Sequence, residues 1–116
     1  DRDGDLDIAA ISYFADYEHA PEQGFVYLQN QGEDRFEAFT FPASRSGRWL
    51  VMDAGDVDGD GDMDIVIGAA SRTPYRVPRG LYESWMREGP SLLVIRNDLV
   101  PPAVAKDPNE RTGAAP

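Results

Sequence analysis

The sequence has no cysteine, only one histidine and only one lysine among its 116 residues. The absence of cysteine excludes a disulfide framework, a zinc ribbon and a thiol nucleophile. No stretch approaches the ~18 consecutive apolar residues that a membrane-spanning helix needs. We therefore expect no membrane insertion and no chemistry that depends on a thiol group.

Common catalytic signatures are also missing from the sequence. There is no Gly-x-Ser-x-Gly turn, no Gly-x-Gly-x-x-Gly motif and no phosphate-binding loop. The single histidine, His19, lies in a polar segment, 16–24, and is expected on the surface. An acid pair of the kind that hydrolyses glycosides stays open as an alternative. On balance the sequence predicts a protein that is not an enzyme.

Acidic residues are concentrated rather than spread along the chain. Asp and Glu total 21 against 11 Lys and Arg, which gives a formal net charge of −10. Nucleic-acid binding is therefore not expected, because it needs a basic surface facing the phosphates. Ten of the acids lie in two short segments: Asp1, Asp3, Asp5, Asp7, Asp53, Asp56, Asp58, Asp60, Asp62 and Asp64. Without these ten aspartates, the chain has 11 acidic and 11 basic residues.

An internal repeat organises the chain. Residues 3–8, Asp-Gly-Asp-Leu-Asp-Ile, align with residues 60–65, Asp-Gly-Asp-Met-Asp-Ile. A second pair of similar segments, 25–30 and 92–97, ends in Asn in both copies. Two copies of a unit of roughly 60 residues are typical of propellers and solenoids.

Short apolar runs within each unit predict β-strands. They are rich in β-branched and aromatic residues and are separated by Gly, Pro, Asn and Asp. The predicted strands are 8–12, 25–28, 35–41, 49–54, 65–70 and 92–95. Residues 80–89 instead predict an exposed helix of one or two turns, with an ion pair between Glu83 and Arg87. Residues 101–116, with four prolines, are expected to form a flexible proline-rich tail.

The second acidic segment has the spacing of a metal-binding loop. Aspartates occupy positions 1, 3, 5, 7 and 9 of residues 56–64, and Gly61 permits a sharp turn. A tight turn would gather these like charges, and a divalent cation would relieve their repulsion. Ca²⁺ takes ~6–8 oxygen ligands and so suits the loop better than Mg²⁺, which tends to keep its waters. The alternative is an acidic, solvated turn without metal. Two copies, each placed before an apolar run, favour the metal site.

An EF-hand does not fit the same residues. That motif needs Glu at position 12 and a following helix. Position 12 is Ile67 in the second copy and Ala10 in the first, and both lie in predicted strands. The spacing therefore favours a calcium loop between β-strands that closes at position 9.

Residues 56–68 resemble the FG-GAP/VCBS repeat, whose copies form β-propeller blades. The shared pattern is Asp-x-Asp-x-Asp-Gly-x-x-Asp followed by Ile-Val-Ile-Gly. Residues 26–32, Phe36 and Phe41 resemble later strands of such a blade, so that the resemblance covers roughly residues 1–97. No literal Phe-Gly…Gly-Ala-Pro signature is present, which favours the VCBS-like branch. The resemblance implies side-chain ligation by Asp56, Asp58, Asp60 and Asp64, with Asp62 through its carbonyl. In the first copy it implies Asp1, Asp3 and Asp7, with Asp5 through its carbonyl, and a position-1 ligand that precedes residue 1.

The expected fold is all-β: a partial β-propeller of about one and a half to two blades of antiparallel strands with Asp-x-Asp-x-Asp-Gly calcium loops. We place a first blade, truncated at its N-terminus, at 1–42, a second blade at 43–100 and the tail at 101–116. The resemblance puts loops 13–24 and 71–90 on the face opposite the calcium loops. Their aromatic and Arg residues suit a protein or glycan ligand. The alternative is that Leu81 and Trp85 serve only to pack the blade.

We expect a non-catalytic, calcium-binding propeller segment of a larger secreted or cell-surface protein, serving adhesion or ligand recognition. The alternatives are an accessory or scaffold domain of a secreted carbohydrate-active enzyme and, less well supported, a cytosolic calcium sensor. The chain begins inside an Asp cluster without Met, which is typical of a piece of a longer protein. Neighbouring blades, or self-association, are expected to cover an apolar face made of Ile8, Ile11, Val26, Leu28, Val51, Ile65, Ile67, Leu93 and Ile95.

Overall fold

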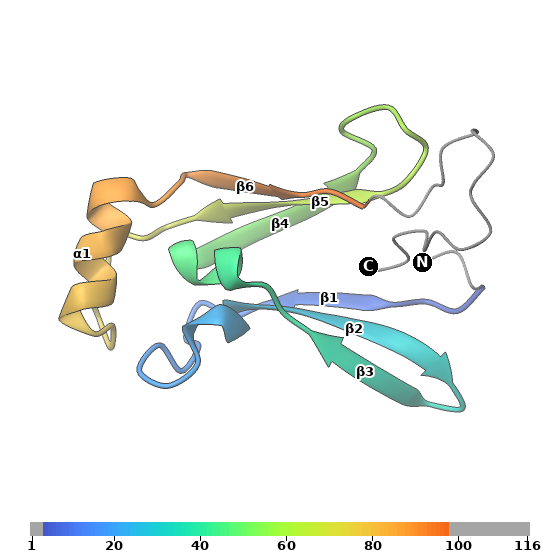
Figure 1. Ribbon diagram of the computed structural model, residues 1–116, viewed down its shortest axis with the longest axis horizontal. Helices are drawn as coiled ribbons and strands as arrows, with labels where there is room; N and C mark the ends of the chain where they lie inside the picture. Colours follow the sequence, from blue (N-terminus) through green and yellow to red (C-terminus); the bar gives the residue numbers. More distant parts are fainter. Residues whose placement is uncertain (1–3, 98–116) are drawn as a thin grey trace, which may run out of the picture.

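A computed structural model describes residues 4–97 as two three-stranded antiparallel sheets (Figure 1). The first sheet has the order β1 (Ile8–Ile11), β2 (Phe25–Gly32), β3 (Arg35–Phe39), and the second has β4 (Trp49–Gly55), β5 (Asp64–Ala69), β6 (Leu92–Ile95). Two 3-10 turns, η1 (Pro21–Gly24) and η2 (Pro42–Ser46), and one helix, α1 (Arg79–Glu88), complete the elements. Each sheet is a meander, as in an incomplete propeller blade, which confirms the predicted fold class. The blade boundaries at residues 42 and 100 stay a prediction, and residues 101–116 lie outside the described residues.

The core lies between the two sheets. Because side chains alternate along a strand, the pairing of Ile11 with Phe25 puts both on one face of the first sheet. That face meets Trp49 and Ile67 of the second sheet, and Phe25, Trp49 and Ile67 are fully buried. Phe41, just beyond β3, stacks on Phe25 with ring centroids 5.5 Å apart. The inner faces of the two sheets therefore pack together around these residues, and a cavity of about 680 Å³ lined by residues of both sheets lies beside them.

The apolar face predicted from the sequence is in fact divided between two faces. Ile11, Ile65, Ile67, Leu93 and Ile95 belong to the core or pack against it. Ile8 and Val51 do not, because their side chains are 46% and 60% exposed on the outer faces. A sequence pattern shows that a strand is apolar on both sides, but not which side meets the neighbouring sheet. Each sheet consequently keeps an outer apolar face that no residue of 4–97 covers fully.

Helix α1 lies close to the predicted segment 80–89 but differs from its prediction in three respects. Its ten residues form more than the one or two turns expected, Trp85 is buried in an otherwise exposed helix, and the ion pair has a different partner. The Trp85 indole N–H donates a hydrogen bond to the Arg45 carbonyl at 2.8 Å, and its ring meets Tyr17 edge-on. Glu83 pairs with Arg79, one turn earlier, at 3.0 Å, instead of with Arg87. No helix within residues 4–97 is both long and apolar enough to span a bilayer.

Candidate metal centre

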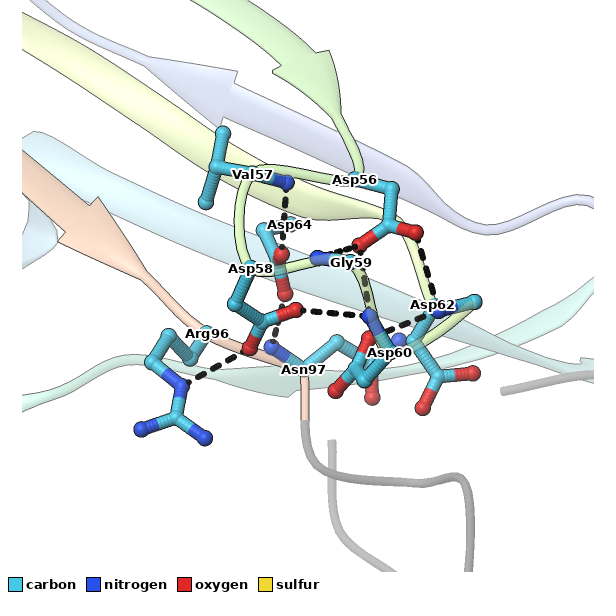
Figure 2. A network of polar contacts seen from close by, with 10 residues as sticks. Asp56, Val57, Asp58, Gly59, Asp60, Asp62, Asp64, Arg96 and Asn97 are labelled. Atoms are coloured by element: carbon cyan, nitrogen blue, oxygen red, sulfur yellow. Dashed lines mark hydrogen bonds and ion pairs between the residues drawn. The ribbon is translucent and has the colours of Figure 1, made fainter.

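Four carboxylates converge in the loop between β4 and β5 (Figure 2). One oxygen from each of Asp56, Asp58, Asp60 and Asp64 lies within 4.8 Å of the others. These residues hold positions 1, 3, 5 and 9 of the predicted loop. Asp56, Asp58 and Asp60 are exposed, whereas Asp64 is buried at the start of β5. The group is therefore open to solvent on one side and anchored to the sheet on the other.

The loop curls around the carboxylate of Asp56. This carboxylate accepts hydrogen bonds from the main-chain N–H groups of Gly61 and Gly59, each at 2.9 Å, and of Asp60 at 3.1 Å. The bond from Gly61, followed by those from Gly59 and Asp60, outweighs desolvation and holds the pKa of Asp56 below its usual value. Gly59 and Gly61 have φ values of +77° and +92°, a region that glycine enters without Cβ strain. The two glycines thus allow the N–H groups to point inward.

Asp64 ties the loop to both neighbouring strands. Its Oδ2 accepts the N–H of Val57 at 3.1 Å, and its Oδ1 accepts the N–H of Asn97, just past β6, at 2.7 Å. Such main-chain donors would be left without an acceptor if the carboxylate were removed. Asp64 is therefore a structural anchor as well as a member of the acidic group.

Asp58 experiences the crowding of like charges most directly. Desolvation, together with the neighbouring Asp60 and Asp64 carboxylates, raises the pKa of Asp58. Arg96, which follows β6, makes an ion pair with Asp58 at 3.1 Å (Figure 2). One guanidinium does not balance four carboxylates. An all-oxygen donor set of this kind suits a hard divalent cation such as Ca²⁺.

The remaining predicted ligands lie elsewhere. The Asp62 side chain is buried and outside the group of four, so that ligation through its carbonyl stays a prediction. Asp1 and Asp3 lie outside the described residues, and Asp5 is exposed. Asp7 accepts hydrogen bonds from the Asn30 N–H at 2.8 Å and the Tyr27 hydroxyl at 2.5 Å. Burial opposes the ionisation of Asp7, but these bonds outweigh it and lower its pKa. The first site is thus only partly visible within residues 4–97.

The two copies agree where both are described. Gly4 has a φ of +93°, and the corresponding Gly61 has +92°. Asp7 occupies the place of Asp64, and each accepts the N–H of an Asn that belongs to the next strand or follows it. The sequence repeat is therefore also a repeat of loop geometry.

The predicted recognition loops meet at the opposite end of the sheets (Figure 1). Residues 14–18 and 75–78 line a common pocket there, together with Arg48. His19 is 74% exposed and pairs with Asp16 at 3.1 Å, which is the surface position expected for it. Trp85 packs against Tyr17, so that the packing alternative holds for this residue. Arg48 was not identified from the sequence, because nothing in its local pattern distinguishes it from other basic residues between turns.

Comparison with known proteins gives one match. The family of FG-GAP-like repeats matches residues 1–67, which is more than half of the chain. That range includes the first Asp cluster, the first sheet, β4 and the whole loop 56–64. No curated protein and no solved structure shows a significant match.

Proposed function

This chain belongs to the family of FG-GAP-like repeats, and on that premise we propose that its loop 56–64 binds Ca²⁺. The bound ion would stabilise a propeller-type segment of a larger secreted or cell-surface protein. One observation carries the proposal: four carboxylates from a single loop lie within 4.8 Å of one another. Their side chains are the four that the family pattern implies as ligands.

Electrostatics explains why a cation would stabilise the loop. Two like charges about 4 Å apart repel by ~1 kcal/mol in bulk water and by more where protein excludes water. A divalent ion replaces this repulsion by attraction to every member of the group. Through Asp64 it would also fix the loop to the start of β5 and to Asn97, beyond the end of β6. Extracellular calcium modules have dissociation constants of ~10⁻⁴–10⁻³ M, which suits a structural role outside the cell.

The other end of the molecule supports a role in recognition rather than catalysis. Phe14 and Tyr75 lie on the two loops and are 68% and 56% exposed. Large exposed aromatic side chains are enriched where proteins contact ligands. His19 faces solvent and pairs with Asp16, which is also exposed, and the sequence has no nucleophile motif. We therefore propose that loops 13–24 and 71–90 bind a ligand and that the chain carries out no reaction.

Thermal unfolding of the full chain with calcium and with chelator tests the metal proposal. At a calcium concentration about 100 times the Kd, the expected stabilisation is ~2.7 kcal/mol. Asp60→Asn should remove most of this gain. Asp34→Asn is the matched control, because it removes the same charge from the turn between β2 and β3 and should leave the gain intact. Identical curves with calcium and with chelator, for a folded sample, would contradict the proposal.

A further inference from the structure

Residues 14–18, 75–78 and Arg48 line a pocket of about 1040 Å³. The two loops that carry most of these residues lie at the end of the sheets near α1, away from the Asp loop (Figure 1). Residues 14–18, which follow β1, form one wall, and residues 75–78, which follow β5, form another. Its volume is at the upper end of the ~300–1,000 Å³ typical of small-molecule sites. The two walls come from equivalent positions in the two sheets, because β1 and β5 both follow an Asp cluster.

Arg48 connects these walls from within. Its side chain is fully buried, Nε–H donates to the Tyr13 carbonyl at 2.8 Å, and Nη1–H donates to the Thr73 carbonyl at 2.9 Å. The guanidinium carbon lies 4.2 Å from the Tyr13 ring centroid and 5.1 Å from that of Tyr17. These contacts hold the cation in one position under the pocket.

The positive charge of Arg48 has no counter-charge among residues 4–97. No described carboxylate makes an ion pair with it, and its buried Nη2 has no hydrogen-bond partner there. Asp16, an acid of the same pocket, pairs with His19 instead. Buried charges are normally paired, because leaving a desolvated charge unpaired is costly. Among common anions, carboxylate and phosphate fit a planar guanidinium best, because two of their oxygens can accept parallel hydrogen bonds from it.

The rest of the lining suits a ring that carries hydroxyl groups. Phe14 and Tyr75 offer exposed aromatic surfaces, and the Arg76 guanidinium carbon lies 5.3 Å from the Tyr75 ring centroid. The carboxylates of Asp16 and Glu18 accept hydrogen bonds and would repel a ligand with several negative charges. One carboxylate, several hydroxyls and a ring face are the features that these groups recognise together.

We propose that this pocket binds an acidic sugar, with its carboxylate directed to Arg48 and its ring against Phe14 or Tyr75. This ligand class rests on the proposed recognition role of the same loops. Nη2 is shielded from solvent, so that direct contact requires a neighbouring side chain to move. Phe14 is suited to this movement, because it is largely exposed and its ring centroid is 5.5 Å from the guanidinium carbon. The strongly acidic loop 56–64 is at the far end and does not oppose the ligand directly.

Titration of the full ¹⁵N-labelled chain in calcium, followed by amide chemical shifts, tests the ligand class. Methyl β-D-glucuronide should shift the amide resonances of residues 13–18 and 75–77. Methyl β-D-glucoside, the matched neutral sugar, should bind at least about tenfold more weakly, since a charge-assisted hydrogen bond is lost. A shift of the same residues by acetyl-Gly-Glu-Gly-amide but not by the glucuronide would overturn the proposal in favour of an acidic peptide. An absence of shifts with all three probes would overturn it altogether.

Variants identify the side chains that bind the glucuronide. Arg48→Gln should abolish the preference for glucuronide over glucoside. Because Arg48 also holds both loops, Tyr75→Ala and Phe14→Ala provide tests at exposed positions, and at least one should weaken glucuronide binding about fivefold or more. Unchanged affinity in both exposed variants would contradict the proposal. A calcium-dependent melt of the same sample reports on the metal site separately, so that a failure here leaves that proposal intact.

Discussion

The Asp64 carboxylate accepts a hydrogen bond from the main-chain N–H of Asn97 at 2.7 Å and so joins the end of the acidic loop to the segment that follows β6. Asp7 and Asn30 repeat this relationship at 2.8 Å in the first copy. The two aspartates hold the same place in the matching segments 3–8 and 60–65, and the two asparagines end the other matching pair. Position 9 of the loop is therefore the point at which each acidic cluster is attached to its blade.

Without metal, Asp64 should contribute more than Asp60 to the free energy of unfolding. Asp64→Ala leaves the N–H groups of Val57 and Asn97 without their acceptor, and is expected to cost about 1–3 kcal/mol of unfolding free energy even in chelator. Asp60 is exposed and accepts one main-chain N–H, that of Asp62 at 2.9 Å, so that Asp60→Ala should cost less in chelator and act mainly by removing the calcium gain. Urea unfolding of both variants with and without calcium measures the difference. Equal losses in chelator would show that Asp64 has no separate structural role.

Arg96 should compete with the metal. Its ion pair with Asp58 partly neutralises the carboxylate group and places a positive charge beside the site. Because exposed ion pairs contribute ~0–1 kcal/mol, Arg96→Gln should tighten calcium binding by up to about fivefold. Isothermal titration calorimetry measures this, with Arg35→Gln as control, since Arg35 pairs with Glu33 at the β2–β3 turn. Weaker binding by the Arg96 variant would mean that Arg96 supports the ion instead.

Tyr17 should make stability fall at alkaline pH. Burial raises the pKa of Tyr17, whose hydroxyl donates to the Tyr13 carbonyl at 2.6 Å. The folded pKa is therefore above the unfolded value of about 10. Its contribution to stability is complete below that pH and is lost as pH rises through the folded pKa. Unfolding experiments across this range should show a smaller alkaline loss for Tyr17→Phe, and an unchanged loss would contradict this assignment.

The outer faces of the sheets should make the isolated chain associate. Val51 and Leu92 are exposed on the outside of the second sheet, and Ile8 on the outside of the first. Repeat units of this kind bury such faces against neighbouring units, and open strand edges promote further pairing. Light scattering after size exclusion in calcium should give a mass above 12.8 kDa. Val51→Lys with Leu92→Lys should lower it, whereas Met86→Lys on α1 should not. A monodisperse monomer of the unaltered chain would contradict this expectation.

Local sequence patterns were sufficient to predict the strands and the acidic loop of this protein. Strand propensity and turn residues predicted the six strands found within residues 4–97, because these signals act between near neighbours. The boundaries were less certain: β2 continues to Gly32, beyond the predicted end at Leu28, since pairing with β3 extends it. The spacing of aspartates in loop 56–64 predicted a metal-binding type of loop, and the resemblance to FG-GAP/VCBS repeats indicated which four carboxylates come together.

Other features depended on contacts between distant residues. The sequence did not show that Ile67 faces the core while Val51 faces outward, because both lie in apolar strands and only sheet packing distinguishes the two sides. It did not decide between packing and recognition for Trp85, which is buried because segments 40 or more residues away reach it. Arg48 meets the carbonyls of Tyr13 and Thr73, which are 35 and 25 positions away. The sequence by itself thus determined the strands and the acidic loop, whose causes are local, whereas only the tertiary structure assembled the Arg48 pocket, because its walls are brought together by the packing of the two sheets.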